Sequence, residues 1–103
     1  MKPAATAPAL YKFRLYVAGD AVNSVQAIAN LEALCQTHLP NRHLIEIVDV
    51  FQQPDRALND RIFMTPTLLR LVPAPQRRVV GTLSNSAIVL HAMDMDALRS
   101  NES

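Results

Sequence analysis

Residues 84–100, SNSAIVLHAMDMDALRS, decide the fold of this chain, because their pattern suits both a helix and a strand. Apolar residues recur every three or four positions, as they do along one face of a helix: Ile88, Ala92, Met95 and Leu98. The continuous apolar run 88–90 contains two β-branched residues, however, and such a run suits a buried strand. The segment alone leaves both structures open, so the elements before it have to decide.

The chain of 103 residues is long enough for one domain and too short for two. We expect a frayed tail at 1–9 and a single domain at 10–100. The net charge of +1 gives no electrostatic reason to expect nucleic acid or an anionic membrane as a partner. No apolar run reaches the length of a membrane span. The one cysteine, Cys35, excludes an intramolecular disulfide and fits a reducing, cytoplasmic compartment.

The first half of the chain predicts a strand, a helix and a second strand. Residues 10–18, LYKFRLYVA, alternate apolar and polar side chains, which is typical of a strand with one buried face. Asp20 or Asn23 can cap a helix over 21–38. Residues 43–51, rich in Ile and Val, predict the second strand, and this order is a βαβ unit with parallel strands. The core face of the helix is expected to carry Val25, Ile28, Cys35 and Leu39.

The second half predicts a short helix over 55–63 and two strands, at 67–72 and 77–83. The turn between the strands is short, so they can pair as a hairpin. Ser84 or Asn85 can cap a helix that follows. If residues 84–100 are that helix, the order is βαβαββα, which is the order of the α/β thioredoxin-like fold with its central mixed sheet.

No residue set in the sequence has the pattern of a catalytic or metal site. In a thioredoxin fold, redox chemistry needs a C-x-x-C motif at the start of the first helix, where the helix N-terminus lowers the thiol pKa. Here that region reads AGDAVNSV, and Cys35 lies about four turns further along, where we expect a small buried hydrophobe. The three histidines lack ligand spacing, and the two glycines form no phosphate-binding loop. We therefore expect no enzyme activity and no cofactor.

The loop MTPT at 64–67 is similar to the loop of thioredoxin folds that holds a cis proline. For an X–Pro bond the cis form is only about 0.5–1 kcal/mol less stable than the trans form, so the sequence permits it. A trans proline that simply ends a helix is equally compatible with these residues. Both conformations of Pro66 stay open at this point.

Arginines gather in the second half and suggest binding. Arg77 and Arg78, with Arg70 across the predicted hairpin, form a basic patch, and Arg56, Asp60 and Arg61 lie along the short helix. Charged residues often protect edge strands, but guanidinium groups also pair with acidic partners. These side chains are polar, are expected to be exposed and are not of a catalytic type. They therefore favour a binding protein over an enzyme.

Several stretches together resemble the KaiB family of cyanobacterial circadian clock proteins: LYVAG, NSV, IVDV, TPTL and VPAPQRRVVGTLSN. The resemblance runs from about Leu10 to Asp96. It implies a non-enzymatic module that binds KaiC, a hexameric ring ATPase, sequesters KaiA and modulates the phosphorylation cycle of KaiC. It also leaves an alternative, a KaiB-like sensory or adaptor domain for a signalling kinase or stress pathway outside the core clock.

The resemblance also implies which residues act. The partner-binding residues would be Phe51, Gln52, Asp60, Arg61, Arg77 and Arg78. Members of the family switch between a tetrameric ground state with the order βαββααβ and a thioredoxin-like monomer that binds KaiC. The residues that would govern this switch are Pro66, Pro73, Pro75, Ala92 and Asp94.

Ala92 favours one of the two states. Members of the family usually carry glycine at this position, and glycine costs about 1 kcal/mol relative to alanine inside a helix. Asp94, Asp96 and Arg99 also suit a continued helix better than a strand. We therefore predict a helix over 84–100, a thioredoxin-like fold and a mainly monomeric chain, with the homotetramer as the alternative.

Overall fold

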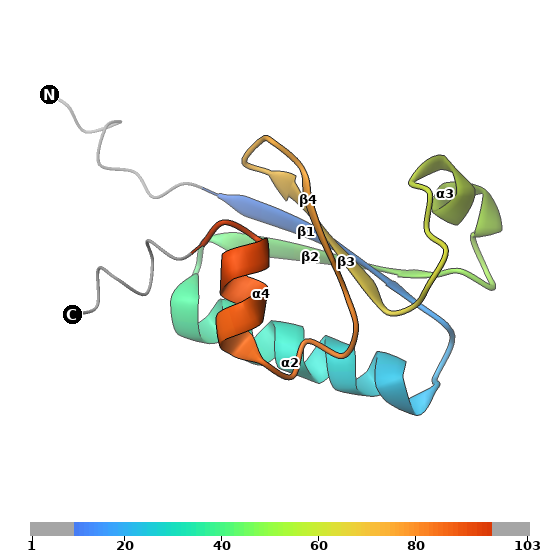
Figure 1. Ribbon diagram of the computed structural model, residues 1–103, viewed down its shortest axis with the longest axis horizontal. Helices are drawn as coiled ribbons and strands as arrows, with labels where there is room; N and C mark the ends of the chain where they lie inside the picture. The colour runs from blue at the N-terminus through green and yellow to red at the C-terminus, as the bar shows by residue number, and fades with distance from the viewer. Residues whose placement is uncertain (1–9, 96–103) are drawn as a thin grey trace, which may run out of the picture.

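A computed structural model describes residues 10–95, so the predicted tail at 1–9 and the end of the predicted domain, 96–100, lie outside the described residues. The order is βαβαββα, as predicted (Figure 1). The elements are β1 (Tyr11–Val17), α2 (Val22–His38), β2 (His43–Asp49), α3 (Pro54–Asn59), β3 (Thr67–Val72), β4 (Arg77–Val80) and α4 (Ser86–Ala92).

One mixed sheet organises these elements, with the strand order β2-β1-β3-β4. The strands β1 and β2 are parallel, with Tyr11 opposite His43 and Val17 opposite Asp49. The strand β3 is antiparallel to both β1 and β4. The predicted βαβ unit, hairpin and thioredoxin-like sheet are therefore confirmed.

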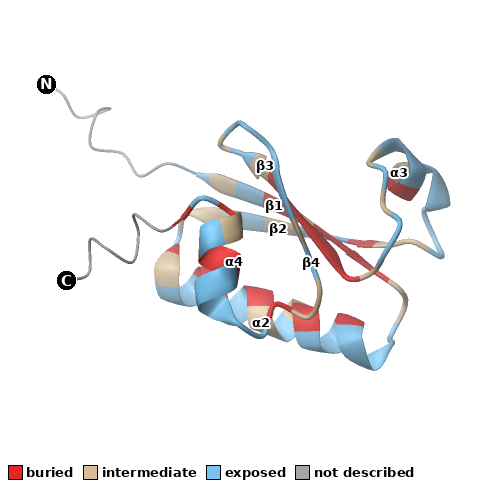
Figure 2. Cartoon of the chain, in the orientation of Figure 1, coloured by how far each residue is buried: buried red, intermediate tan, exposed pale blue. Residues whose placement is uncertain are grey.

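Helices cover the two faces of the sheet unequally. Figure 1 shows α2 and α4 on one face, while α3 lies toward the other face at one end of the sheet. The α2/α4 face holds the larger apolar core, and Figure 2 shows its buried residues along β3 and the inner side of α2. On the α3 face the buried apolar cluster is small: Tyr16, Val48, Ala57 and Leu69.

The deciding segment is helical, as predicted, but the helix is shorter. Its cap is Asn85, whose side chain accepts a hydrogen bond from the backbone N–H of Ile88 at 3.2 Å. The helix ends at Ala92, and Asp94 has a left-handed φ of 61°. Our prediction that the helix continues through Asp94 is therefore wrong, while its extension over 96–100 lies outside the described residues.

The predicted apolar stripe of this helix is confirmed only in part: Met95 is buried but Ile88 is not, and Leu98 lies outside the described residues. Ile88 is 59% exposed, whereas Val89 and Leu90 are buried, together with Met93 and Met95. The helix is rotated about its axis relative to the prediction, so that Val89 and Leu90, and not Ile88, face the sheet. A rotation of this size depends on how the helix docks, which spacing alone does not fix.

The start of α2 differs from the prediction as well. Neither Asp20 nor Asn23 caps it, because the cap position is Ala21, with no side-chain hydrogen bond. Ser24, buried in the first turn, instead accepts a hydrogen bond from the N–H of Ala18 at 2.9 Å. Val25 is 54% exposed and does not belong to the core face. The buried residues of α2 are Ser24, Ala27, Leu31, Leu34 and Cys35, and the predicted Ile28 and Leu39 also pack in this core.

Candidate protein-binding surface

Both short helices end in the same motif, and in each a predicted functional residue occupies the critical position. In α3 the N–H of Ile62 bonds to the carbonyl of Ala57 at 2.8 Å, and the N–H of Arg61 to that of Leu58 at 3.0 Å. Arg61 has a φ of 56°. This is a Schellman motif, in which the left-handed residue is usually glycine. It also explains why α3 ends at Asn59 and not at Phe63 as predicted.

The end of α4 repeats this geometry with Asp94 as the left-handed residue. The N–H of Met95 bonds to the carbonyl of Leu90 at 2.7 Å, and the N–H of Asp94 to that of His91 at 3.0 Å. Asp94 therefore turns the chain at the end of the deciding segment. Its carboxylate lies 3.9 Å from the Arg77 guanidinium, and both side chains are exposed, so this ion pair is weak.

The β3–β4 hairpin supplies an arginine to each of these helix ends. Arg78 donates to the carbonyls of Asp60, at 2.6 Å, and Arg61, at 2.8 Å. Arg70 donates to the carbonyl of Met93 and, at 2.6 Å, to that of Pro75. Cationic donors suit the ends of helices, where carbonyls lack partners and the helix dipole is negative.

The basic patch that we predicted is therefore not a single surface. Arg70 is only 2% exposed and lies inside the molecule, although Arg77 is opposite to it in the sheet register. Arg78 is directed at the end of α3, and Arg77 at Asp94. The structure brings Asp60, Arg61 and Arg78 together but places Arg77 in a different contact.

Under α3, four charged side chains pair across the sheet. Arg14 contacts Glu46 and Asp60, each at 2.9 Å, and Arg56 contacts Glu46 at 2.7 Å. The hydroxyl of Tyr16 donates to the Asp60 carboxylate at 2.5 Å and lies 3.0 Å from the carbonyl of Arg56. Two cations and two anions balance, so the network fixes α3 to the sheet without building up net charge.

The pKa values follow from this pairing. Hydrogen bonds from Arg56 and Arg14 lower the pKa of Glu46 to about 2. Burial alone would raise the pKa of Asp60, but hydrogen bonds from Tyr16 and Arg14 outweigh it, and the pKa is lowered. Burial and the hydrogen bond to Asp60 raise the pKa of Tyr16 to about 12. These groups keep one protonation state near neutral pH, which suits a structural network.

The turn after β2 exposes the predicted residues Phe51 and Gln52. The Asp49 carboxylate accepts hydrogen bonds from the N–H of Phe51 at 2.9 Å and of Gly19 at 3.2 Å. Gly19 has a φ of 55°, which glycine adopts without strain. Phe51 is held 74% exposed by this turn.

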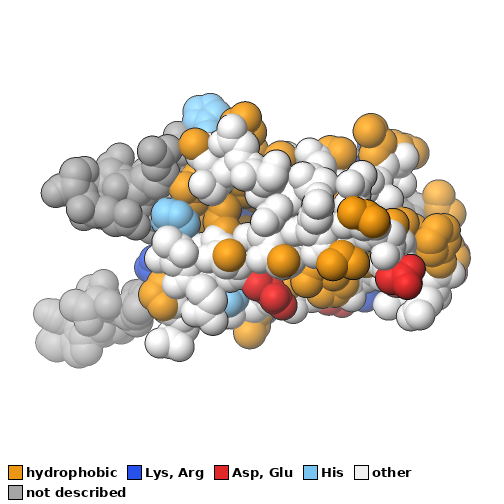
Figure 3. Space-filling model, turned by 90° about the horizontal axis from the view of Figure 1, so that it is seen from below, with side chains coloured by type: hydrophobic (Ala, Val, Ile, Leu, Met, Phe, Trp, Pro, Cys, Tyr) orange, Lys and Arg blue, Asp and Glu red, His pale blue; other side chains and the backbone are white. Residues whose placement is uncertain are grey.

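Sequence reasoning missed two exposed apolar residues next to this turn, Phe63 at 84% and Met64 at 64% exposure. Both follow α3 and precede the cis Thr65–Pro66 bond, which resolves the conformation of Pro66. Figure 3 shows hydrophobic side chains gathered at this end of the molecule, with an acidic group beside them. Consecutive large apolar residues just before a turn were the available signal, but they read as core. The bonds before Pro73 and Pro75 are also cis.

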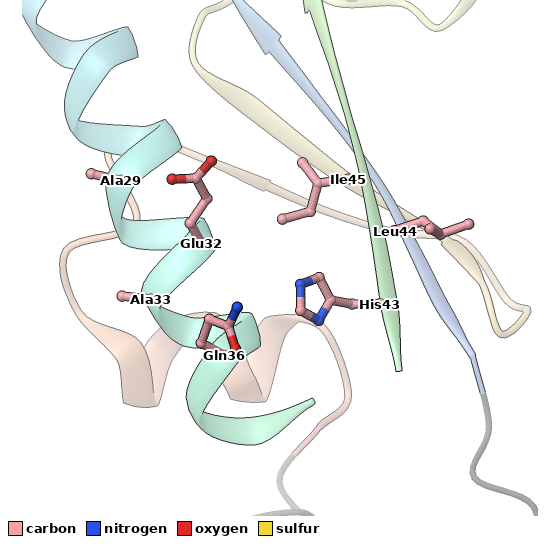
Figure 4. A pocket seen from close by; sticks show the side chains of 7 residues that line it. All are labelled: Ala29, Glu32, Ala33, Gln36, His43, Leu44 and Ile45. Atoms are coloured by element: carbon pink, nitrogen blue, oxygen red, sulfur yellow. The ribbon is translucent and has the colours of Figure 1, made fainter. Parts of the chain in front are cut away.

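A cleft of about 600 Å³ lies elsewhere, between α2 and the edge strand β2 (Figure 4). Glu32 and Gln36 reach into it from α2, and His43 faces them from β2. The Nδ1–H of His43 donates to the carbonyl of Leu39 at 2.7 Å. Within residues 10–95, no three His, Cys, Asp or Glu side chains are placed to hold a metal ion.

Cys35 is buried, as predicted. Its side chain lies in the core of the α2/α4 face, and burial raises the pKa of the thiol to about 12. At neutral pH the thiolate, which is the nucleophile, is therefore scarce. In the described part of the chain no helix is long and apolar enough to cross a membrane.

Comparison with known proteins assigns the family. A family model described as the KaiB domain matches residues 14–95. The chain belongs to the KaiB family. Circadian clock protein KaiB3 of Synechocystis sp. is 44% identical over 82 residues, 80% of each chain. The circadian clock oscillator protein KaiB of Prochlorococcus marinus is 38% identical over 85 residues, 82% of this chain and 73% of that one.

Solved structures confirm the thioredoxin-like fold. The N-terminal domain of Synechococcus elongatus SasA has a TM-score of 0.64 at 18% identity, covering 88% of this chain and 87% of that one. Chloroplastic thioredoxin z has a TM-score of 0.66 at 19% identity, covering 90% of this chain and 79% of that one. At such identities the likeness shows the fold alone, and the KaiB relatives, named as clock proteins, indicate the kind of function.

Proposed function

We propose that this KaiB-family chain is a non-enzymatic, cytoplasmic binding module that docks on a KaiC-type ATPase ring and modulates its phosphorylation cycle. The observation that carries the proposal is the cluster at the α3 end of the sheet, where Phe51, Gln52 and Arg61 are exposed and Asp60 and Arg78 fix the end of α3. A rigid scaffold that presents an exposed aromatic beside an arginine is typical of interface hot spots.

Binding to the purified KaiC-type ATPase of the same cell tests the proposal. We expect wild-type protein to be retained by the immobilised ring and to change the phosphorylation of the ATPase over time. Phe51→Ala and Arg61→Gly should each weaken binding about tenfold. Glycine suits the φ of 56° at position 61, so this variant removes the side chain without harming the helix end.

Ile88→Ala is the matched control, because Ile88 is exposed on α4, on the other face of the sheet from α3 (Figure 1). It should bind like wild type. Wild-type protein that is not retained by any KaiC-type ATPase of the cell would contradict the proposal.

The active form, in this proposal, is the thioredoxin-like monomer, and the tetrameric βαββααβ state is its counterpart. Ala92 lies in the last turn of α4, where glycine would weaken the helix by up to about 1 kcal/mol. Ala92→Gly should therefore raise the fraction of the alternative state, seen as a larger species by light scattering. An Ala92→Gly protein that stays as monomeric and as helical as wild type would argue against a switch at this position.

A second function, an adaptor domain for a signalling kinase, is favoured by one observation. The solved SasA domain with the same fold is the N-terminal domain of a longer protein, so this architecture also serves as a part of larger assemblies. Retention of a kinase from the same cell, in place of the KaiC-type ring, would support this function.

A further inference from the structure

A hollow of about 210 Å³ lies next to the predicted binding residues and is formed by segments that are distant in sequence. This volume suits one large side chain and is below the roughly 300–1,000 Å³ typical of small-molecule sites. Apart from the hydroxyl of Thr65, the side chains around it are apolar. The lining residues are Ala18, Val50, Phe51, Ala57, Ile62, Phe63, Met64 and Thr65.

Three of the lining residues are largely exposed: Phe51, Phe63 and Met64. Single exposed apolar side chains are common on protein surfaces and need no explanation. Here they surround one hollow, and a contiguous apolar patch of this kind marks an interaction site. Phe63 gains nothing for the fold from an exposure of 84%, so its burial remains available to a partner.

Acidic residues adjoin the lining of the hollow in three segments: before α2, at the end of β2 and in the first turn of α3. Asp49 bonds through its carboxylate to the N–H groups of Phe51 and Gly19, one residue before the lining begins at Val50. Asp20 is exposed at the start of α2, and Asp55 is exposed in the first turn of α3. These three carboxylates therefore place negative charge close to the lining residues Ala18, Val50 and Ala57, whereas Arg61 adjoins Ile62.

We propose that the hollow receives one large apolar side chain from a loop of the partner protein, and that this loop carries a lysine or arginine beside that side chain. This inference rests on the proposed function, because the partner is the KaiC-type ATPase. The apolar side chain is the anchor and contributes most of the affinity of this contact. The cation selects the orientation of the loop by facing Asp20, Asp49 and Asp55.

The apolar part is tested with Phe63→Ser and Met64→Ser, in binding measurements against the purified KaiC-type ATPase. Each should raise the Kd about tenfold, because each removes apolar surface that binding would bury. Ile88→Ser is the matched control, since Ile88 is also exposed but lies on α4, on the other face of the sheet. Exposed positions tolerate such changes, and unchanged circular dichroism and unfolding midpoints would verify this.

The charge part is tested with Asp20→Lys and Glu32→Lys. Both variants make the same change at exposed positions at or on α2, but Glu32 lies at the cleft beside β2 and not at the hollow. Asp20→Lys should weaken binding about three- to fivefold, mainly through a slower association rate that salt reduces further. Glu32→Lys should not weaken it.

The outcomes separate this inference from the function on which it rests. If wild-type protein does not bind the ATPase, both are rejected. If wild-type protein binds and Phe51→Ala or Arg61→Gly weakens it, while Phe63→Ser and Met64→Ser bind like wild type, only the hollow is rejected. Sedimentation of the chain alone tests a second copy as occupant, and a dimer abolished by Phe63→Ser would overturn the proposal.

Discussion

The two faces of the sheet are stabilised by different interactions. The α2/α4 face is a continuous apolar core into which β1, β3 and both helices contribute side chains. The α3 face has four buried residues in its apolar cluster and relies on the paired charges of Arg14, Glu46, Arg56 and Asp60. Apolar burial involves no titrating group, whereas exposed ion pairs are weak and are screened by salt.

Under the proposed function, this difference separates the part of the molecule that supplies stability from the part that binds. The α2/α4 face can tolerate substitutions at its surface, because its contribution to the free energy of unfolding comes from side chains buried in the core. The α3 face borders the exposed cluster of Phe51, Phe63 and Met64, so a partner that binds there contacts the less stable layer. Elements that bind or move are generally drawn from the less stable parts of a fold.

The largest effect should come from a cavity in the apolar face. Leu31 is 1% exposed in the middle of α2, and Leu31→Ala removes core volume that the surroundings cannot fill. We expect a loss of about 2–5 kcal/mol in the free energy of unfolding, measured by urea denaturation. Leu58→Ala, at a 69% exposed position on α3, is the control and should cost less than about 0.5 kcal/mol. Similar losses for both would refute the ranking of the two faces.

Arg70 is the polar exception within the apolar face, and replacing it should give the second largest effect. Arg70→Met keeps the apolar stem but leaves the carbonyls of Met93 and Pro75 without their cationic donor. Each buried polar group that loses its partner costs about 1–3 kcal/mol. We expect a total loss of that order, together with faster amide exchange in the last turn of α4.

Arg77→Met provides the control for Arg70. Arg77 is opposite to Arg70 in the sheet but exposed, with one ion contact at 3.9 Å. It should change the stability by less than about 0.5 kcal/mol. If α4 exchanges no faster in Arg70→Met than in Arg77→Met, the arginine does not hold the end of α4.

On the α3 face, Tyr16→Phe removes one hydroxyl from beneath the helix. The ring stays in the apolar cluster, while Asp60 loses its hydrogen bond from Tyr16 and keeps that from Arg14. We expect a loss of about 1 kcal/mol, the usual net value of one hydrogen bond. The pKa of Asp60 should rise toward its ordinary value, which an NMR titration of its carboxyl carbon would detect. An unchanged titration would show that Arg14 alone holds the carboxylate.

The regular elements could be predicted because local pattern and packing agree in them. The strand at 67–72 has the predicted ends, and the strand at 11–17 and the helix that ends at His38 follow their apolar patterns. Asn85 was predicted as a cap because its side chain is the kind that accepts an N–H at a helix start. The comparison with the family at Ala92 added the prediction of a helix over 84–100, of which the structure has Ser86–Ala92.

The remainder depends on tertiary contacts that no local pattern records. Because Arg70 is charged, the sequence predicts it at the surface. In the structure it is buried and donates to carbonyls at the end of α4 and in the hairpin turn. Phe63 was predicted only as the end of the short helix, yet the Schellman turn at Arg61 ends that helix earlier and leaves Phe63 exposed. At Arg70, charge thus gave the opposite of the observed burial, and at Phe63 the local pattern missed the turn.

The smallest effect should distinguish the faces by their response to acid. Glu46 has its pKa lowered to about 2 by Arg56 and Arg14, so it stabilises the fold above its ordinary pKa. This contribution is lost as the pH falls from about 5 to about 2, because the folded state must then bind the proton. The side chain is 45% exposed, so solvent screening keeps the contribution below about 1 kcal/mol at neutral pH. Glu46→Gln should therefore be slightly less stable than wild type at pH 7, and the two stability curves should converge toward pH 2.

Glu32→Gln makes the same substitution on α2, at a position that lies outside this ion-pair network, and its curve should follow that of wild type over the whole range. Curves for wild type and Glu46→Gln that stay parallel through this range would mean that the charges under α3 do not contribute to the stability of that face.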